Sequence, residues 1–460
     1  MNLPAAWGVY QSKQPRAPSN QRGQQQRQSG TTKGEQQVHS HMRTAVIVIG
    51  DLGRSPRMQY HAVSLAEAGS DVDLIGLAGA EVIPAVAANP RIRVHRLPDS
   101  GFAGRAKGGV GRFVFGSAMR SLRQGAGLLM ALLRIPKPDT ILVQNPPAIP
   151  TLFVGWLASR LRGARFVIDW HNLSHTIAAV KVGERHRAVK AIARSERRWA
   201  GRADAHLTVS KALAEWLARE YRVKAAVVYD RPGSAFTRPS AADAAALWSR
   251  IAAETNLGTA RPPIVVCPTS WTPDEDFDLV LEALERTERQ LKRDAEPAAA
   301  RDSSGDKSPA LVVFLTGRGA IRQTFEARAA RRNFTSIAVK TLWLEPADYP
   351  KLIGMADLGL CLHQSSSGLD LPMKLADLRG CGVPVAVFDY APVLGEVMTS
   401  GQQGVTFHDP GDLSTVFLNV AKGSVAADSP MARARVWLAE NSPERWDAQW
   451  AAAARPVLLP

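Results

Sequence analysis

The chain has 460 residues, of which 45% are hydrophobic and 22% are charged, a composition typical of a soluble globular protein with room for two domains. Its three cysteines, Cys267, Cys361 and Cys381, are too few for a disulfide framework and show no metal-ligand spacing. No hydrophobic run reaches the roughly 20 residues that a membrane-spanning helix needs.

The net charge of +15 is unevenly distributed. Residues 1–225 carry 33 basic and 14 acidic residues, whereas the remainder carries 24 and 28. The basic half therefore predicts a polyanionic partner, such as nucleic acid, anionic lipid or a lipid diphosphate. Nucleic acid is disfavoured because the basic region has no interleaved aromatic residues and no recognisable binding motif.

Residues 1–42 are rich in Gln, Ser, Gly and Arg, which predicts a disordered basic tail. Strand and helix patterns then alternate twice, first over residues 43–228 and again over residues 229–440. Continuous apolar strands of this kind are typical of parallel sheets covered by helices on both faces. The sequence thus predicts an α/β protein with two Rossmann-like domains. The predicted strands are residues 44–50, 71–77, 91–97, 140–145, 165–170, 205–210, 263–270, 310–317, 336–343, 358–363 and 383–388.

The first strand is followed by the loop GDLGRSPRMQ, residues 50–59, which lacks the G-x-G-x-x-G fingerprint and so disfavours a nicotinamide or flavin enzyme. Ser55 and Pro56 predict the start of a helix. Gly53 permits close backbone approach, while Arg54 and Arg57 add positive charge beside that helix start. We expect an anion contact here, with a purely structural turn as the alternative.

The stretch IDWHN, residues 168–172, ends a predicted strand. Strand alternation places Asp169 and His171 on the same side, where they can act together on a sugar hydroxyl. We therefore predict that His171 and Asp169 are catalytic and that Asn172 contacts the acceptor, the substrate that carries this hydroxyl group. The alternative is a histidine with a structural role.

Three acids in TSWTPDEDF, residues 269–277, raise the possibility of a metal site at Asp274, Glu275 and Asp276. A capping box between Thr272 and Glu275 at a helix start explains the same residues more simply. We therefore predict no metal site. The preceding residues 269–271 remain candidate ligand contacts.

The stretch HQSSSGLDLPMKLADL, residues 363–378, predicts a phosphate site, because small residues before a helix N-terminus leave room for an anion. Asp370 is expected to cap the helix, and Lys374 is expected to neutralise phosphate oxygens. Asp377 is expected to accept hydrogen bonds from ribose hydroxyl groups. Arg318, between two glycines after another strand, is expected to hold the diphosphate. The alternative for these charges is a surface ion pair. The predicted donor-binding residues are Arg318, Ser365, Ser366, Ser367, Gly368, Lys374 and Asp377.

A basic stripe is predicted along one helix, close to the apolar and arginine-containing residues 112–133. Such a stripe is often only a solvated face, but in the basic half it favours docking on an anionic bilayer. Its members are Arg187, Lys190, Arg194, Arg197 and Arg198.

With these residues in view, the chain resembles glycosyltransferases of the GT-B fold, specifically the chitobiosyldiphosphodolichol β-mannosyltransferase family. The resemblance covers most of residues 43–410 in the family's order. It is carried by the stretches GDLGRSPRMQYHAVSLAEAG, VQNPPAIPTL, IDWHN, TSWTPDEDF, WLEPADYPKLIGMADLGLCLHQSSSGLDLPMKLADLRGCGVPV and GEVMTSGQQGVTF.

The resemblance implies an inverting transferase that moves β-linked mannose from GDP-mannose to chitobiose on a polyprenyl diphosphate, without a metal or a further cofactor. It implies a peripheral enzyme on the cytoplasmic face of a membrane, with residues 441–460 forming a helix that returns to the first domain. The related E-x7-E element is incomplete, since only Asp377 stands near an acid position. The alternatives are another nucleotide-sugar-dependent transferase on a polyprenyl-linked glycan, or a non-catalytic GT-B partner subunit.

Overall fold

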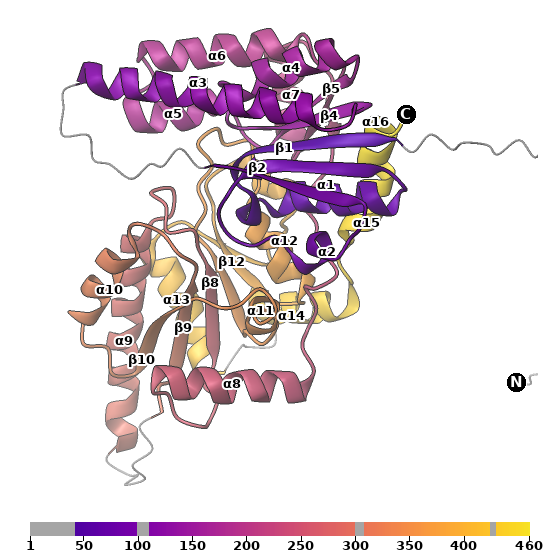
Figure 1. The fold of residues 1–460 in the computed structure, drawn as a ribbon. Coiled ribbons are helices and arrows are strands. Elements are labelled where there is room, and N and C mark those ends of the chain that lie inside the picture. The colour runs from indigo at the N-terminus through magenta and orange to yellow at the C-terminus, as the bar shows by residue number, and fades with distance from the viewer. Residues whose placement is uncertain (1–41, 99–109, 300–307, 424–428) are drawn as a thin grey trace, which may run out of the picture. The chain divides into compact units, whose positions relative to one another are not determined.

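The computed structural model describes residues 42–98, 110–299, 308–423 and 429–460, so the predicted tail lies almost entirely outside the described residues. The described chain forms two parallel β-sheets, each covered by helices (Figure 1). This confirms the prediction of two α/β domains. In the described ranges we find no helix that combines the length and the hydropathy needed to cross a bilayer.

The first domain contains a seven-stranded sheet in the order β3-β2-β1-β4-β5-β6-β7, and all of its neighbouring strands pair in parallel. Residues 44–48 of its central strand are fully buried, as their continuous apolar pattern predicts. The order reverses between β1 and β4, which is the topological switch point of a doubly wound sheet. The strands are β1 Arg43–Asp51, β2 Asp71–Leu77, β3 Ile92–Leu97, β4 Thr140–Asn145, β5 Arg165–Trp170, β6 Ala205–Thr208 and β7 Ala226–Val227.

Helices cover both faces of this sheet. One apolar core joins the strands to α3, α4, α6 and α7, and a second joins the opposite face to α1 and to the C-terminal helices. Pro56 occupies the first turn of α1, which therefore begins where the sequence predicts. The helices are α1 Pro56–Glu67, α2 Pro84–Ala87, α3 Val110–Arg134, α4 Thr151–Arg162, α5 Ser174–Val182, α6 Arg187–Ala200 and α7 Lys211–Glu220.

The second domain repeats the same topology in a six-stranded sheet, with the order β10-β9-β8-β11-β12-β13 and its switch point between β8 and β11. Its strands are β8 Ile264–Pro268, β9 Leu311–Thr316, β10 Ile337–Leu342, β11 Leu358–Cys361, β12 Val385–Phe388 and β13 Gly404–Phe407. Its helices are α8 Ala241–Thr255, α9 Phe277–Ala299, α10 Arg322–Ala330, α11 Tyr349–Gly354, α12 Met373–Gly380, α13 Pro410–Ala421 and α14 Pro430–Glu440.

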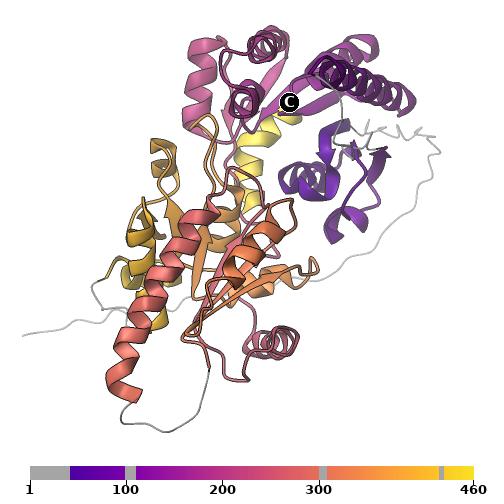
Figure 2. The same cartoon turned by 90° about the vertical axis from the view of Figure 1, so that its left-hand side faces the viewer.

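The C-terminal segment packs against the first domain. It comprises α15 Trp446–Gln449, the π-helical turn η3 Trp450–Ala454 and α16 Arg455–Leu458. The carbonyl of Leu458 accepts a hydrogen bond from Thr140 of β4, and that of Val457 accepts one from Arg165 of β5. Figures 1 and 2 show this yellow segment beside the first sheet. The last residues of the chain therefore contribute to the first domain's core.

Two local predictions about helix starts are wrong. Helix α9 begins at Phe277, and Asp276 caps it by accepting hydrogen bonds from the backbone N–H groups of Asp278 and Leu279. Thr272 and Glu275 therefore form no capping box at this helix. Helix α12 has no side-chain cap, because the carboxylate of Asp370 accepts hydrogen bonds from the preceding serine loop instead.

Candidate functional site

The residues that follow β5 and β11 come together. Asn172 Nδ2 donates to Ser366 Oγ over 3.3 Å, and the hydroxyl of Thr176 lies 3.0 Å from the same oxygen. Because open α/β sheets bind ligands beyond the carboxyl ends of their strands, this is the expected place for a site. The predicted catalytic stretch of the first domain thus contacts the predicted donor loop of the second.

Asp169 is the centre of a buried charge cluster in the first domain. Its carboxylate accepts two hydrogen bonds from Arg57, from Nε over 2.8 Å and from Nη2 over 3.0 Å. Arg57 also donates to Asp230 and to the carbonyl of Val228. Asp169 and Arg57 are 0% and 1% exposed, so this is a fully desolvated ion pair whose polar atoms have partners.

The cluster keeps Asp169 ionised. Burial by itself would raise the pKa of this carboxyl, but Arg57 and His171 outweigh it and hold the pKa well below its usual range. Burial would likewise lower the pKa of Arg57, and the neighbouring Asp169 and Asp230 raise it instead. A carboxylate with so low a pKa, enclosed in protein, is a poor proton acceptor for a substrate.

His171 is the member of the pair that reaches the surface. Its Nε2 lies 2.9 Å from Asp169 Oδ2, and its side chain is 19% exposed. Because an ionised carboxylate only accepts hydrogen bonds, the ring proton is assigned to Nε2 and the lone pair to Nδ1. The structure therefore brings the two predicted catalytic residues together in different roles, with His171 as the base candidate and Asp169 orienting it.

The predicted anion contacts of the first loop differ from the expectation. Arg57 is buried in the cluster above, where its guanidinium pairs with Asp169 and Asp230 instead of facing the loop. Gly53 donates its N–H to Asp51, and a Cβ at this residue would lie 2.4 Å from the carbonyl oxygen of Glu81. Its close approach is thus to protein backbone. Arg54 remains 54% exposed and pairs with Asp51.

The serine loop of the second domain is held by its own hydroxyl groups. Ser365 Oγ accepts hydrogen bonds from the N–H groups of Ser367 and Gly368 and donates to Asp370. Gly368 has a φ of +70°, a left-handed conformation that favours glycine. These bonds shape the chain that leads to the uncapped N-terminus of α12, whose amide groups and dipole favour an anion.

Lys374 lies in the first turn of α12 and pairs with Glu275 over 2.5 Å. Glu275 is buried and also accepts hydrogen bonds from the Thr269 hydroxyl and the Ser270 amide. Glu275 therefore connects the loop after β8 to the lysine. Sequence reasoning missed this role, because the spacing of Thr272 and Glu275 matches a capping box. Trp271, a predicted ligand contact, is 1% exposed and stacks on Phe277 in the core.

Arg318 lies on the loop after β9, with its guanidinium 4.1 Å from the centre of the Trp343 ring. A Cβ at either flanking glycine, Gly317 or Gly319, would lie within 2.4 Å of the carbonyl oxygens of residues 269 and 270. Both glycines are therefore required for the Arg318 loop to pack on the loop that holds Glu275. The sequence signal for Arg318 was this pair of glycines.

Asp377 lies one turn after Lys374 and is half-buried. Burial raises its pKa well above the usual range, the Asp230 carboxylate raises it further, and Lys374 opposes both. Asp377 therefore stays a predicted donor contact beside Lys374, with a carboxyl group that holds its proton more tightly than usual.

His363 is a further charged residue of the donor loop that sequence reasoning did not single out. Its ring lies between Asp274 at 3.4 Å and Asp370 at 3.1 Å. Burial would lower its pKa, but these two carboxylates outweigh it and raise the pKa to about 9. The histidine is therefore a cation near pH 7, adding positive charge beside the serine loop.

A basic and apolar surface lies on the helices α3–α6, which Figure 1 shows together on one side of the first sheet. Nine of the eleven large hydrophobic side chains that are exposed in the described residues lie on or beside α3, α4 and α5, including Leu122, Phe153 and Leu161. Phe153 contacts Trp199, and Arg198 and Arg202 lie over that indole. The predicted basic stripe is exposed along α6.

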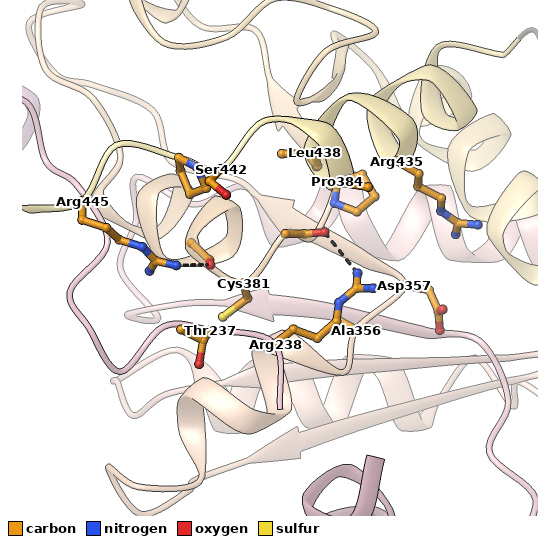
Figure 3. Close-up of a pocket in the computed structure, with 14 residues that line it drawn as sticks. Thr237, Arg238, Ala356, Asp357, Cys381, Pro384, Arg435, Leu438, Ser442 and Arg445 are labelled. Atoms are coloured by element: carbon orange, nitrogen blue, oxygen red, sulfur yellow. Dashed lines mark hydrogen bonds between the residues drawn. The ribbon is translucent and has the colours of Figure 1, made fainter. Parts of the chain in front are cut away.

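A separate hollow of about 420 Å³ lies in the second domain and contains none of the predicted site residues (Figure 3). Arg445 and Arg238, which line it, donate to the carbonyl groups of Gly380 and Gly382. Arg445 also donates to the carbonyl of Phe236. These arginines fasten the end of α12 to the segment that links the domains.

Residues 53–230 match the family model described as glycosyl transferase 4-like domain. The chain is 33% identical to the chitobiosyldiphosphodolichol β-mannosyltransferase of Mus musculus, over 90% of this chain and 88% of the relative, and 34% identical to that of Yarrowia lipolytica, over 91% and 87%. The chain belongs to this family. It is also 34% identical to the UDP-glycosyltransferase TURAN of Arabidopsis thaliana, over 90% of this chain and 97% of the relative.

Solved structures support the fold. HepE from Anabaena, determined with UDP and glucose, aligns with a TM-score of 0.61 and 14% identity over 91% of this chain and 99% of that chain. WaaG, a glycosyltransferase of lipopolysaccharide biosynthesis, aligns with a TM-score of 0.59 and 12% identity over 91% and 99%. The protein is a mannosyltransferase-like glycosyltransferase with the GT-B fold.

Proposed function

We propose that the protein transfers β-linked mannose from GDP-mannose to a chitobiosyl polyprenyl diphosphate, with inversion at the anomeric carbon. The relatives' names supply the acceptor class. The observation that carries the proposal is the contact of Asn172 and Thr176 with Ser366. It supports the proposal because His171 directly precedes Asn172, and Ser366 belongs to the loop expected to hold the donor diphosphate.

In this mechanism the second domain holds the nucleotide diphosphate through the N-terminus of α12, Lys374 and Arg318. His171 Nδ1 accepts the proton of the acceptor hydroxyl as that oxygen attacks the anomeric carbon, and the bond to the diphosphate breaks on the opposite face. Negative charge grows on the leaving diphosphate, so cations beside it stabilise the transition state more than the bound donor. Asp169 stabilises the imidazolium that forms, as the partner of a catalytic histidine does.

The direct test is transfer from labelled GDP-mannose to a synthetic chitobiosyl diphosphate lipid, with the linkage of the product determined by NMR. We expect one β-linked mannose per acceptor. Parallel reactions with UDP-glucose and UDP-N-acetylglucosamine address the second candidate, a UDP-sugar transferase, which the name of the Arabidopsis relative favours. Preference for a UDP-sugar would overturn the mannose assignment, and absence of nucleotide binding by calorimetry would favour a non-catalytic subunit.

We also propose that the α3–α6 surface rests on the cytoplasmic face of a membrane that carries the acceptor. Exposed Leu122 and Phe153 are suited to the headgroup boundary, and neighbouring arginines to anionic lipid. R194E/R197E on α6 should reduce binding to phosphatidylserine vesicles by at least about tenfold at physiological salt, since each basic residue near such a surface contributes about 1 kcal/mol. R289E/R293E on α9 makes the same change in net charge and should leave binding unchanged. Equal losses in both variants would reject this surface.

A further inference from the structure

The C-terminal segment reaches the Asp169 cluster through a tryptophan. Trp450 Nε1 donates a hydrogen bond to His61 Nδ1 over 3.0 Å, and both side chains are buried. Four residues earlier, Trp446 Nε1 donates to Ser64 Oγ over 2.9 Å. The two indoles therefore make bonds of similar length to the same helix, α1, but only Trp450 bonds to a titratable side chain.

The bond from Trp450 fixes the tautomer of His61. Because Nδ1 accepts a hydrogen bond, a neutral His61 carries its proton on Nε2, which lies 3.3 Å from Asp169 Oδ2. That N–H faces the carboxylate without a well-aligned hydrogen bond, so the contact is chiefly electrostatic. His171 Nε2 lies 2.9 Å from the same oxygen. Two imidazole N–H groups thus converge on one carboxylate oxygen.

The charged and titratable groups around Asp169 Oδ2 together determine how strongly this carboxylate interacts with His171. Arg57 and His61 face it from α1, His171 faces it from the end of β5, and Asp230 lies behind Arg57 on the chain after β7. Arg57 Nε donates to this oxygen over 2.8 Å and His171 Nε2 lies 2.9 Å from it, so the His61 N–H is the third group that faces it. A change in the His61 tautomer would therefore present a lone pair to Asp169 and alter its interaction with His171.

We propose that Trp450 is a positioning residue for the transfer reaction, because its indole N–H orients the His61 proton toward Asp169 and so sets the basicity of His171. The inference rests on the proposed role of His171 as base. Without the Trp450 bond, only the poorly aligned 3.3 Å contact with Asp169 favours a proton on Nε2, so His61 can place its proton on Nδ1 in part of the molecules. The Asp169 carboxylate then has one N–H group fewer to stabilise its charge, so it stabilises the imidazolium form of His171 more strongly. The base is therefore protonated at a higher pH.

The kinetic test compares Trp450→Phe with Trp446→Phe, which keep an aromatic ring and each lose one buried N–H bond to α1. For Trp450→Phe we expect the acidic limb of the kcat profile to move upward by about half a pH unit or more. Below that limb, where His171 is protonated, we expect kcat to fall by about threefold or more with KM for the donor unchanged. Trp446→Phe should leave the limb in place. Equal shifts in both variants, or a shift in neither, would overturn the proposal.

A double-variant cycle separates positioning from general loss of packing. His61→Phe removes the relay while keeping a ring, so it should move the acidic limb as Trp450→Phe does. The double variant should then show no further shift, because both changes break the same chain. Additive shifts would mean that Trp450 acts by another route and would contradict the proposal.

NMR of protein labelled with 15N-histidine tests the relay without any transfer reaction. The wild-type His61 ring, assigned by its absence in His61→Phe, should show a protonated Nε2 and an unprotonated Nδ1, and Trp450→Phe should show a mixture of tautomers. A wild-type His61 protonated on Nδ1 would overturn the inference even if mannose transfer is found. A correct tautomer with no transfer to any acceptor would instead reject the proposed function alone.

Discussion

The two domains use charge in different ways at the place where they meet. In the first domain Arg57 and Asp169 are completely buried, and every strong donor and acceptor between them is satisfied. In the second domain Lys374 and His363 are each 23% exposed, although Glu275 and Asp370, which pair with them, are largely buried. A buried, satisfied pair is rigid, whereas a half-exposed cation remains accessible to a ligand.

This difference separates the residues that set geometry from those that bind. The first domain fixes the orientation of one histidine, while the second holds several cations beside a loop and an uncapped helix N-terminus. A ligand that meets both domains would thus meet an oriented base on one side and positive charge on the other. Substitutions in the two regions should consequently differ, with the first affecting stability and chemistry and the second affecting mainly the handling of phosphate.

The largest effect should come from Arg57→Met. It leaves Asp169 buried with only imidazole partners, and breaking a buried pair in this way typically costs about 3–5 kcal/mol. Urea unfolding should show this loss. The control is Arg96→Met, which removes the pairing of Arg96 with the exposed carboxylate of Glu81 and should cost no more than about 1 kcal/mol. Similar losses in the two variants would mean that burial does not distinguish these pairs.

His171→Gln should decrease kcat by about 10²–10⁴-fold, because general base catalysis contributes that much, while the urea midpoint changes little. His95→Gln is a matched control, since His95 lies 2.8 Å from Asp73 in the same domain but far along the chain from the predicted site. We expect its transfer rate to equal that of the wild type. A His171→Gln enzyme with normal kcat would assign the base to another residue.

The pairing of Asp169 with His171 could be predicted because strand alternation is a local rule. The two Rossmann-like sheets could be predicted for the same reason, since buried parallel strands have continuous apolar sequences. The burial of Arg57 could not be predicted, because its partners Asp169 and Asp230 lie more than a hundred residues along the chain. A positive residue beside a glycine-rich loop looks the same in sequence whether it faces solvent or the core.

At Glu275, in contrast, a correct local pattern led to a wrong prediction. Its spacing from Thr272 matches a helix-start pattern. The helix nevertheless begins at Phe277, two residues after Glu275, and the Glu275 carboxylate pairs with Lys374, which is distant in the sequence. Two short strands were not predicted: β7 has only two residues, and β13 begins at Gly404, directly after a glycine-containing turn sequence. The interactions of a side chain could be predicted where its partners are close to it in the sequence.

Lys374→Met and Arg318→Ala should each reduce mannose transfer by about 10²–10³-fold, the usual cost of removing a group that stabilises developing charge. Calorimetry should show weaker GDP binding in both variants. Lys351→Met on α11, which removes a lysine paired with Asp348 in the same domain, should bind and transfer normally. Near wild-type transfer by either site variant would remove that residue from the diphosphate site.

The smallest effect concerns pH and His363. Its pKa is about 9 in the folded protein and near 6.5 when unfolded, so its contribution to stability is complete below pH 6.5 and is lost as the pH rises through 9. The free energy of unfolding of the wild type, relative to that of His363→Gln, should therefore fall by on the order of 2 kcal/mol between these pH values. Taking the difference cancels other groups that titrate in this range. A constant difference would show that Asp274 and Asp370 do not hold a cation at this position, and the donor loop would then have one positive charge fewer with which to attract a diphosphate.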